Sequence, residues 1–255
     1  LDMDSLPATE IPADEVMPYF DWKMFYLICR IKDTGSEAAL ELKEEALEKI
    51  AELKSHGNLK IMAAMEFFSA WSEGDTVVME ENGDEFRIPM LRQEDATVLE
   101  DGSKACLSLA DFVPSAGSGK KSVCGFFAVS ADADTEKDLV TQAVLDTLAE
   151  AASSMLDSRI ADAVRAEGMK IVKPAAGYPC FPDHSVKAEI LEHLKNREKL
   201  GILLSESYGM TPDASVCGMI FIHPEACYPD IRHIGKEQFS DYCRRRGLDE
   251  TEGRV

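Results

Sequence analysis

The chain has 255 residues, a length that fits one large domain or two small ones, and 45% of them are hydrophobic. With 27 basic and 47 acidic residues its formal net charge is −20. Such a chain lacks the basic face that nucleic acid or an anionic membrane surface requires, so neither is expected as a partner. No apolar run reaches the roughly 18 residues that span a bilayer. Seven scattered cysteines without a C-x-x-C pair are typical of buried thiols in a reducing cytoplasm.

The N-terminal part of the chain is predicted to form an arm followed by a helix. Residues 1–15 are acidic, contain prolines and show no hydrophobic periodicity, so they are expected as an extended arm. The remaining 16–255 are expected as one domain, because no repeat or Gly/Ser-rich linker divides them. After a dense apolar run, apolar residues at helical spacing begin behind Ser36, a suitable N-cap, and end at Gly57.

Short segments rich in Val, Ile, Phe and Met predict strands in the middle of the chain. The dipeptide Asn82-Gly83 separates two of them and is the strongest short signal for a hairpin. The predicted strands span 59–71, 75–80, 85–91 and 121–131.

The second half of the chain is predicted to combine helices with two core strands. Thr135 and Asp138 form a capping-box pattern at the start of a long apolar helix. Because helices and hairpin-linked strands mix without regular βαβ alternation, the predicted fold class is α+β, a single domain with a twisted, largely antiparallel sheet flanked by helices. The predicted helices span about 135–164, 185–201 and 236–247, and the predicted core strands span 201–209 and 215–223.

A glycine-rich segment, SAGSGKK (115–121), is similar to a phosphate-binding loop. That motif needs a glycine where this chain has Pro114, and a Ser or Thr where it has Lys121. A solvent-exposed turn is therefore the favoured interpretation.

Two groups of cysteine and histidine raise the possibility of metal or thiolate chemistry. His223, Cys227 and Cys217 are possible zinc ligands of a metal-dependent hydrolase, but Pro224 interrupts them and no fourth ligand is evident. Cys180 and His184 could form a nucleophile and its base, but the sequence shows no third group to orient them. Neighbouring Asp183 and Ser185 are more simply N-caps of the following helix.

Two loop-rich segments, 173–187 and 205–229, carry the most specific pattern. GYPCFPDHSVK, then SESYGMTPDASVCGMIFIHPEACY and a helix ending in DYCRRRG, together resemble the C-terminal activation domain of cobalamin-dependent methionine synthase. VMPYFDW (16–22), SLADFV (108–113) and LAEA (148–151) fall in the same order as in that family. The resemblance covers roughly residues 16–247, which is most of the chain.

The resemblance implies a module that binds S-adenosylmethionine and serves a cobalamin carrier. In that family, inactive cob(II)alamin receives an electron from a flavodoxin-type donor and a methyl group from S-adenosylmethionine. Reduced cobalt is the nucleophile, so the protein acts by positioning the methyl donor. This chain has no D-x-H-x-x-G motif, so cobalamin is expected on a partner domain or corrinoid protein. The family also implies a cytoplasmic location.

Three charged residues match ligand-binding positions of the family. Asp21 and Glu150 match acidic positions, where a carboxylate suits the ammonium and the electron-poor sulfonium of the donor. Lys173 matches an arginine that faces the carboxylate of the donor, although lysine lacks the bidentate fork of arginine.

Four further residues complete the implied site. Ala175 and Gly177 match positions where the backbone approaches the ligand closely, which a glycine permits. Tyr178 belongs to the same pattern, and Tyr228 matches an aromatic residue on the adenosine side. The resemblance implies no metal ligand and no catalytic side chain.

The favoured hypothesis is an activation module that binds S-adenosylmethionine, either on its own or as part of a longer protein. It would belong to a cobalamin-dependent methyltransferase system without a self-contained catalytic set. The alternative is a corrinoid-protein interaction module of the same fold that has lost S-adenosylmethionine binding. Lys173 favours this alternative, as does Thr211, which stands where the family often has a large aromatic residue. Cys217 also departs from the family pattern, which has serine there.

Overall fold

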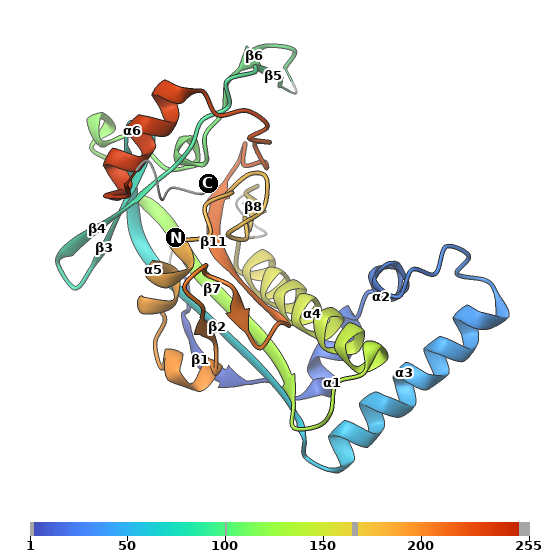
Figure 1. Cartoon of the computed structure of the whole chain (residues 1–255). Coiled ribbons are helices and arrows are strands. Elements are labelled where there is room, and N and C mark those ends of the chain that lie inside the picture. The colour runs from blue at the N-terminus through green and yellow to red at the C-terminus, as the bar shows by residue number, and fades with distance from the viewer. Residues whose placement is uncertain (1–2, 100, 165–167, 250–255) are drawn as a thin grey trace.

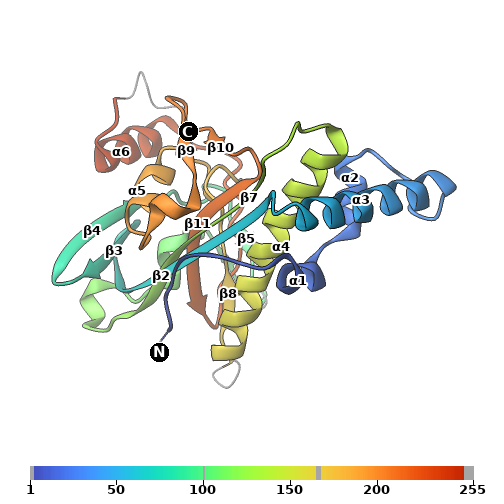
Figure 2. The same cartoon turned by 90° about the horizontal axis from the view of Figure 1, so that it is seen from below.

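A computed structural model describes residues 3–99, 101–164 and 168–249 (Figures 1 and 2). A twisted sheet of seven strands lies at the centre of this part of the chain. The long helix α4 (Leu139–Val164) covers one face, and α5 (Val186–Glu192) packs on the other. Every strand pairing of the sheet in the described ranges is antiparallel, so the predicted fold class is confirmed.

The strand order is β4-β3-β2-β7-β11-β8, and β1 pairs with β2 alongside β3. The two long central strands, β2 (Leu59–Glu73) and β7 (Ser122–Ala133), pair from Leu59 opposite Ala133 to Ala70 opposite Ser122. Beyond β7, β11 continues the sheet. The edge strand β8 pairs only with the end of β11, from Phe221 to His223. The other strands are β1 (Leu6–Glu10), β3 (Thr76–Glu81), β4 (Asp84–Pro89), β8 (Lys170–Val172) and β11 (Ser215–His223).

Alternation of side chains gives this sheet two separate cores. Ala63, Phe127 and Ile220 point towards α4 and belong to one core cluster. Their neighbours, such as Ala64 and Phe126, point to the opposite face and pack with α5. Both faces of the central strands are therefore buried, because successive residues of a strand point to opposite sides. The near-continuous apolar sequences of β7 and β11 follow from this double burial.

Several element predictions are confirmed by the backbone. Asn82 and Gly83 have φ values of 53° and 93° and form the predicted hairpin turn between β3 and β4. Ser36 caps α3 (Glu37–Ser55) by accepting a hydrogen bond from the Ala39 amide at 3.2 Å. The last predicted helix is α6 (Lys236–Arg246), which Gly247 ends in the left-handed conformation.

Three element predictions are wrong in detail. Asp138 itself caps α4 through the Thr141 amide at 2.7 Å, so the capping box from Thr135 does not exist. The helix predicted over 185–201 stops at Glu192, because Asn196 turns left-handed before the short 3-10 turn η5 (Arg197–Leu200).

The core strand predicted over 201–209 is also absent. Only β9 (Leu203–Leu204) is extended there, and it pairs with β10 (Met210–Thr211) in a small separate sheet. Leu203 is 70% exposed, so this apolar stretch does not join the core.

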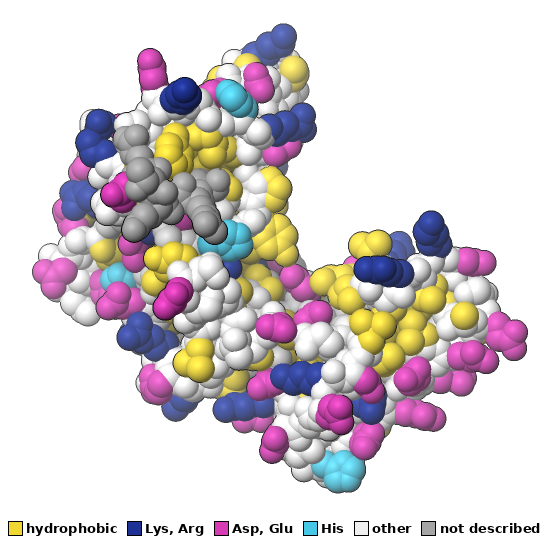
Figure 3. All heavy atoms as spheres, in the orientation of Figure 1, with side chains coloured by type: hydrophobic (Ala, Val, Ile, Leu, Met, Phe, Trp, Pro, Cys, Tyr) yellow, Lys and Arg dark blue, Asp and Glu magenta, His cyan; other side chains and the backbone are white. Residues whose placement is uncertain are grey.

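The helices α1 (Ala13–Val16), α2 (Trp22–Ile28) and α3 form a lobe that packs against α4 (Figures 1 and 2). At the other end, α6 lies near the small hairpin of β5 (Thr97–Val98) and β6 (Lys104–Ala105). A notch separates the two ends in the space-filling view (Figure 3), and the ribbon of α4 runs along its inner end. No helix in the described ranges is both long and apolar enough to cross a membrane.

Part of the predicted N-terminal arm takes part in the sheet. Within residues 1–15, Leu6–Glu10 forms β1, and Glu10 lies opposite Met62 of β2. The Ala8 amide also donates to the Lys195 carbonyl at 2.9 Å. The division between an arm and a domain at residue 16 stays a prediction.

Candidate ligand-binding site

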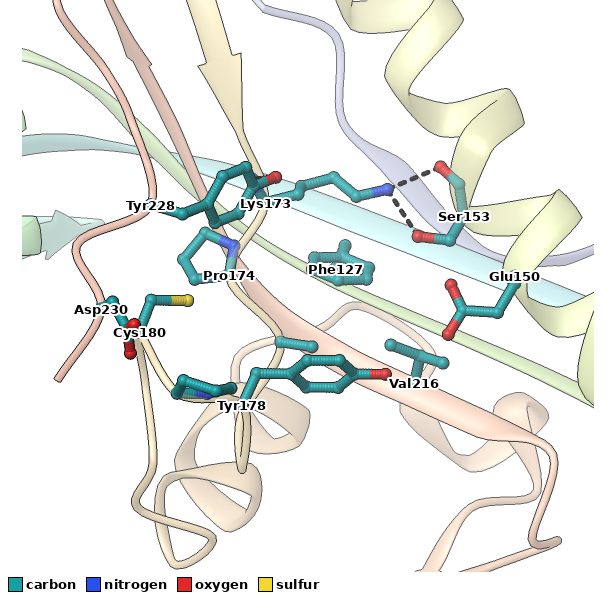
Figure 4. Close-up of a pocket in the computed structure, with 12 residues that line it drawn as sticks. Phe127, Glu150, Ser153, Lys173, Pro174, Tyr178, Cys180, Val216, Tyr228 and Asp230 are labelled. Atoms are coloured by element: carbon teal, nitrogen blue, oxygen red, sulfur yellow. Dashed lines mark hydrogen bonds between the residues drawn. The ribbon is translucent and has the colours of Figure 1, made fainter. Parts of the chain in front are cut away.

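A cavity of about 380 Å³ opens on the α4 side of the sheet (Figure 4). Phe127 of β7 and Val216 of β11 form its floor, and α4 contributes one wall. The opposite wall is the segment 173–180, which we call the rim. The lining residues are Phe127, Glu150, Ser153, Lys173, Pro174, Ala175, Tyr178, Pro179, Cys180, Val216, Tyr228 and Asp230.

The rim is held against β11 by backbone hydrogen bonds that extend the β8 ladder. The Met219 amide donates to the Pro174 carbonyl at 3.1 Å, and the Ala176 amide donates to the Cys217 carbonyl at 3.0 Å. Gly218 lies between them, and a Cβ atom there would stand 2.1 Å from the Pro174 oxygen. The glycine is therefore what lets the rim approach β11 so closely.

A tight turn closes the rim at Gly177. The Gly177 amide donates to the Phe181 carbonyl, and the Phe181 amide donates to the Tyr178 carbonyl, both at 2.8 Å. Gly177 has a φ of 97°, a backbone conformation that residues other than glycine rarely adopt. A Cβ atom there would lie 2.3 Å from the His184 ring. The turn projects Tyr178, which is 53% exposed, at the mouth of the cavity.

The side chain of Lys173 extends from the rim to α4. Its Nζ donates to the Ser153 carbonyl at 2.6 Å and to Ser153 Oγ at 2.7 Å (Figure 4). It also lies 2.9 Å from Asp157 Oδ1 and 4.4 Å from the centre of the Phe127 ring. Burial lowers the pKa of Lys173, while Asp157 and then Glu150 raise it. The ammonium thus joins the two walls of the cavity.

Glu150 of α4 points its carboxylate into the space between α4 and the rim (Figure 4). Burial raises its pKa, Lys173 opposes that shift, and Asp157 and Asp146 add to it. Asp146, Glu150, Ser153 and Asp157 share one face of α4, because their spacing of four, three and four residues follows the helical repeat.

Two tyrosines border the opening. Tyr228 is 57% exposed, and its hydroxyl oxygen accepts a hydrogen bond from the Lys173 amide at 2.9 Å. Burial raises the pKa of both Tyr178 and Tyr228, so both hydroxyls stay protonated at neutral pH. Their rings offer flat apolar surface at the mouth of the cavity.

The base of the rim is anchored to α6 by a buried polar network. Asp183 Oδ2 accepts from the Tyr242 hydroxyl at 2.7 Å and from Arg246 Nε at 3.2 Å. The other end of the Arg246 guanidinium makes a bidentate pair with Glu189 of α5 at 2.6 and 2.7 Å. Ser185 Oγ accepts from Arg246 as well, at 3.0 Å. Asp183 therefore links the rim to α6, and its side chain also accepts from the Ser185 amide before α5.

Five of the seven implied ligand-binding residues lie around this one cavity. They are Glu150, Lys173, Ala175, Tyr178 and Tyr228. Gly177 shapes the rim without lining the cavity, and Asp21 lies outside it as the N-cap of α2. Asp21 Oδ1 accepts from the Lys23 amide at 2.8 Å and the Met24 amide at 3.4 Å. Ligand binding by the seven stays a prediction.

Sequence reasoning missed Ser153 and Asp157, the partners of Lys173. Their spacing from Glu150 on one face of a predicted helix is the signal that could have found them. It also missed Asp230 and Pro179 at the mouth, where the Ile231 amide donates to the Pro179 carbonyl at 3.1 Å.

The cysteine and histidine groups take other roles. Burial raises the pKa of the Cys180 thiol to about 11, which makes it a poor nucleophile at neutral pH. The ring of His184 contacts Lys187 instead, with 2.8 Å between Nδ1 and Nζ. Cys217 is buried in β11 and is in no disulfide. In the described ranges no group of three or more His, Cys, Asp or Glu side chains is placed to hold a metal ion.

The glycine-rich segment 115–121 forms an exposed turn. Ser118 donates to the Ser115 carbonyl, and Gly119 is left-handed. Lys121 is paired with Glu80 at 2.8 Å and lies over the Trp71 ring. The solvent-turn interpretation is confirmed.

The structure is an α+β domain with a cavity between its long helix and the rim. A model of the family described as "Vitamin B12 dependent methionine synthase, activation domain" matches residues 12–247, and the chain belongs to this family. A crystal structure of the MetH reactivation domain bound to AdoHcy has the same fold, with a TM-score of 0.84 and 27% sequence identity. The match covers 98% of this chain and 88% of that one. The family resemblance found in the sequence is confirmed.

Proposed function

We propose that this chain binds S-adenosylmethionine in the cavity between α4 and the rim and presents its methyl group to cobalamin on a partner domain or corrinoid protein. The observation that carries the proposal is the convergence of the rim motif, Glu150 and Tyr228 on one cavity. The cavity volume of about 380 Å³ falls in the usual range for small-molecule sites. The AdoHcy in the related MetH domain supports the same ligand class.

Each part of the cavity has a distinct task in this proposal. The Glu150 carboxylate attracts the positive charge of the sulfonium and ammonium groups. Tyr178 and Tyr228 provide flat surfaces for the adenine ring. The rim backbone fixes the ligand so that the methyl group faces outward, which is catalysis by positioning.

Cobalamin on the partner would supply the nucleophile that takes the methyl group, and the electron pair of the broken carbon–sulfur bond would stay on sulfur. S-adenosylhomocysteine would be the product left in the cavity. A flavodoxin-type protein as reductant and a cytoplasmic location belong to the same proposal. Together these make the chain part of a cobalamin-dependent methyltransferase system.

Isothermal titration of the protein with S-adenosylmethionine tests the proposal. Saturable binding to one site is expected, and absence of binding at millimolar ligand would contradict it. Tyr178→Ala should weaken binding by about threefold to tenfold through loss of ring contact. Leu203→Ala is the control, because Leu203 is also an exposed large side chain but does not line the cavity.

One observation favours a second candidate, the interaction module that no longer binds the methyl donor. Lys173 replaces the expected arginine, and its ammonium is already engaged by α4. Capture of a purified corrinoid protein by this chain, combined with no binding of S-adenosylmethionine, would select that candidate.

A further inference from the structure

The ammonium of Lys173 is already engaged by α4. An ammonium carries three N–H donors. Three acceptors surround it within 2.9 Å: the Ser153 carbonyl, Ser153 Oγ and Asp157 Oδ1. All three belong to α4, and the Phe127 ring occupies a further side at 4.4 Å.

The positive charge of Lys173 is also neutralised within the protein. Asp157 carries the compensating negative charge, and the Lys173 side chain is only 5% exposed. Turning the ammonium towards a ligand would break two short hydrogen bonds and one ion pair, and would leave the Asp157 charge uncompensated. Such an exchange gains little, because a charge-assisted bond to the ligand would only replace one that is already present.

The rest of the cavity offers no substitute cation. Among the described lining residues, Lys173 is the single basic side chain, and Glu150 and Asp230 are acidic. Two backbone donors of the rim are also engaged, since the Lys173 amide donates to the Tyr228 hydroxyl and the Tyr178 amide to the Ala175 carbonyl. A ligand carboxylate in this cavity would therefore meet like charge without a counter-ion.

We infer that the cavity recognises the adenosine and the cationic part of a sulfonium nucleoside and makes no use of the amino-acid carboxylate. Decarboxylated S-adenosylmethionine should then bind at least as well as S-adenosylmethionine itself. The inference rests on the proposed function, because it concerns the ligand of the same cavity. It assigns Lys173 a structural role, the joining of the rim to α4, in place of carboxylate recognition.

Parallel isothermal titrations of the wild-type protein with these two ligands test the inference. The decarboxylated ligand lacks the negative charge, so the acidic cavity is expected to bind it equally or more tightly. Loss of a real carboxylate contact would instead weaken it by about tenfold or more. A weaker binding of the decarboxylated ligand by more than about threefold would overturn the inference.

Asp157→Asn tests whether Asp157 neutralises Lys173. The amide keeps the size and the acceptor oxygen but removes the charge, so the ammonium would attract a ligand carboxylate. The affinity for S-adenosylmethionine relative to the decarboxylated ligand should rise by about threefold or more. Asp162→Asn, an exposed acid on α4, removes the same charge and should leave the ratio unchanged. An unchanged ratio in Asp157→Asn would overturn the neutralising role of Asp157.

The two ligands also separate this inference from the proposed function. Binding of S-adenosylmethionine with poor binding of the decarboxylated form overturns the inference and leaves the proposed function intact. Failure of both ligands at millimolar concentration overturns both.

Discussion

Burial shifts the pKa values of two ionisable residues of the cavity in opposite directions. The pKa of Lys173 is lowered and that of Glu150 is raised, because burial disfavours the charged form of each. Each shift is opposed by the other residue, since the Lys173 charge favours ionised Glu150 and the reverse also holds. Glu150 directs its carboxylate towards the cavity, whereas the ammonium of Lys173 is engaged by Ser153 and Asp157 of α4.

Glu150→Gln should weaken S-adenosylmethionine binding and stabilise the protein at neutral pH. A carboxyl whose pKa is raised by folding costs stability as pH rises through that raised value, so removing it increases the free energy of unfolding. Loss of its charge should weaken binding by about threefold to tenfold. Urea unfolding and titration calorimetry measure the two effects.

The same substitution tests whether Glu150 causes the pH dependence of S-adenosylmethionine binding. Wild-type affinity should fall as acidification protonates Glu150, and Glu150→Gln should lose that step. A variant that keeps the wild-type pH profile would rule out Glu150 as the titrating group. Asp146→Asn is the control, since Asp146 lies one turn away on α4 and does not line the cavity.

Gly177→Ala should lower the free energy of unfolding by more than a Gly→Ala substitution at an uncrowded left-handed position does. Gly201→Ala is the matched control, because Gly201 also has positive φ but has open space around a Cβ atom. We expect a loss of about 1 kcal/mol at Gly201 and about 2 kcal/mol or more at Gly177. If the His184 ring causes the difference, Gly177→Ala in a His184→Ala background should cost no more than Gly201→Ala. Chemical denaturation compares the wild type with Gly177→Ala, Gly201→Ala, His184→Ala and the double variant.

At the scale of elements, α6 secures the rim through one buried arginine. The Arg246 side chain is 5% exposed and contacts Asp183, Ser185 and Glu189. Asp183 is itself 3% exposed at its side chain, so it depends on these partners for its charge. The rim, α5 and α6 are therefore expected to unfold together.

Arg246→Ala should lower the free energy of unfolding by about 2–4 kcal/mol, because it leaves a buried carboxylate without its cation. Arg244→Ala changes the same helix and the same charge at a side chain that is 76% exposed. It should cost about 0.5 kcal/mol or less. Equal losses in the two variants, measured by urea unfolding, would show that the network contributes nothing specific.

Local signals predicted the elements that depend on local interactions. Ser36 and Asn82-Gly83 gave correct positions, because a cap and a tight turn are decided by adjacent residues. The stretch over 201–209 has the apolar composition of a core strand, yet the main sheet already ends at β8 and offers it no partner. β8 has three residues and depends on pairing with β11, which no local pattern reveals.

The candidate site was also predictable only in its local parts. The rim motif gave the correct segment, because its prolines and Gly177 shape the chain locally. The engagement of Lys173 was not predictable from the rim alone, since Ser153 and Asp157 reach it from α4 across the cavity. Asp21 caps α2 and does not line the cavity, so its contact with the ligand stays a prediction.

At the scale of the whole molecule, the charge of −20 acts against compactness. Acidic side chains outnumber basic ones over much of the face seen in Figure 3, so their mutual repulsion is distributed over both sides of the notch. Most ion pairs in the described ranges lie at the surface and contribute little each.

Added salt should therefore stabilise the protein. Raising NaCl from about 10 to about 150 mM shortens the screening length from about 30 to about 8 Å. We expect the melting temperature to rise by about 2–5 °C, because repulsion is spread widely and ion pairs are local. Circular dichroism during heating measures this. A fall in melting temperature would mean that the ion pairs outweigh the repulsion.

The distribution of the cavity walls along the chain has a consequence for biosynthesis. A ribosome releases the protein from its N-terminus, so Phe127 and the face of α4 emerge before the rim. Tyr228 emerges later, and Arg246, which secures Asp183 at the base of the rim, follows close to the end of the described chain. A partial chain without α6 lacks Tyr242 and Arg246, both of which donate to the Asp183 carboxylate. In a growing chain the base of the rim is therefore secured only after α6 has emerged.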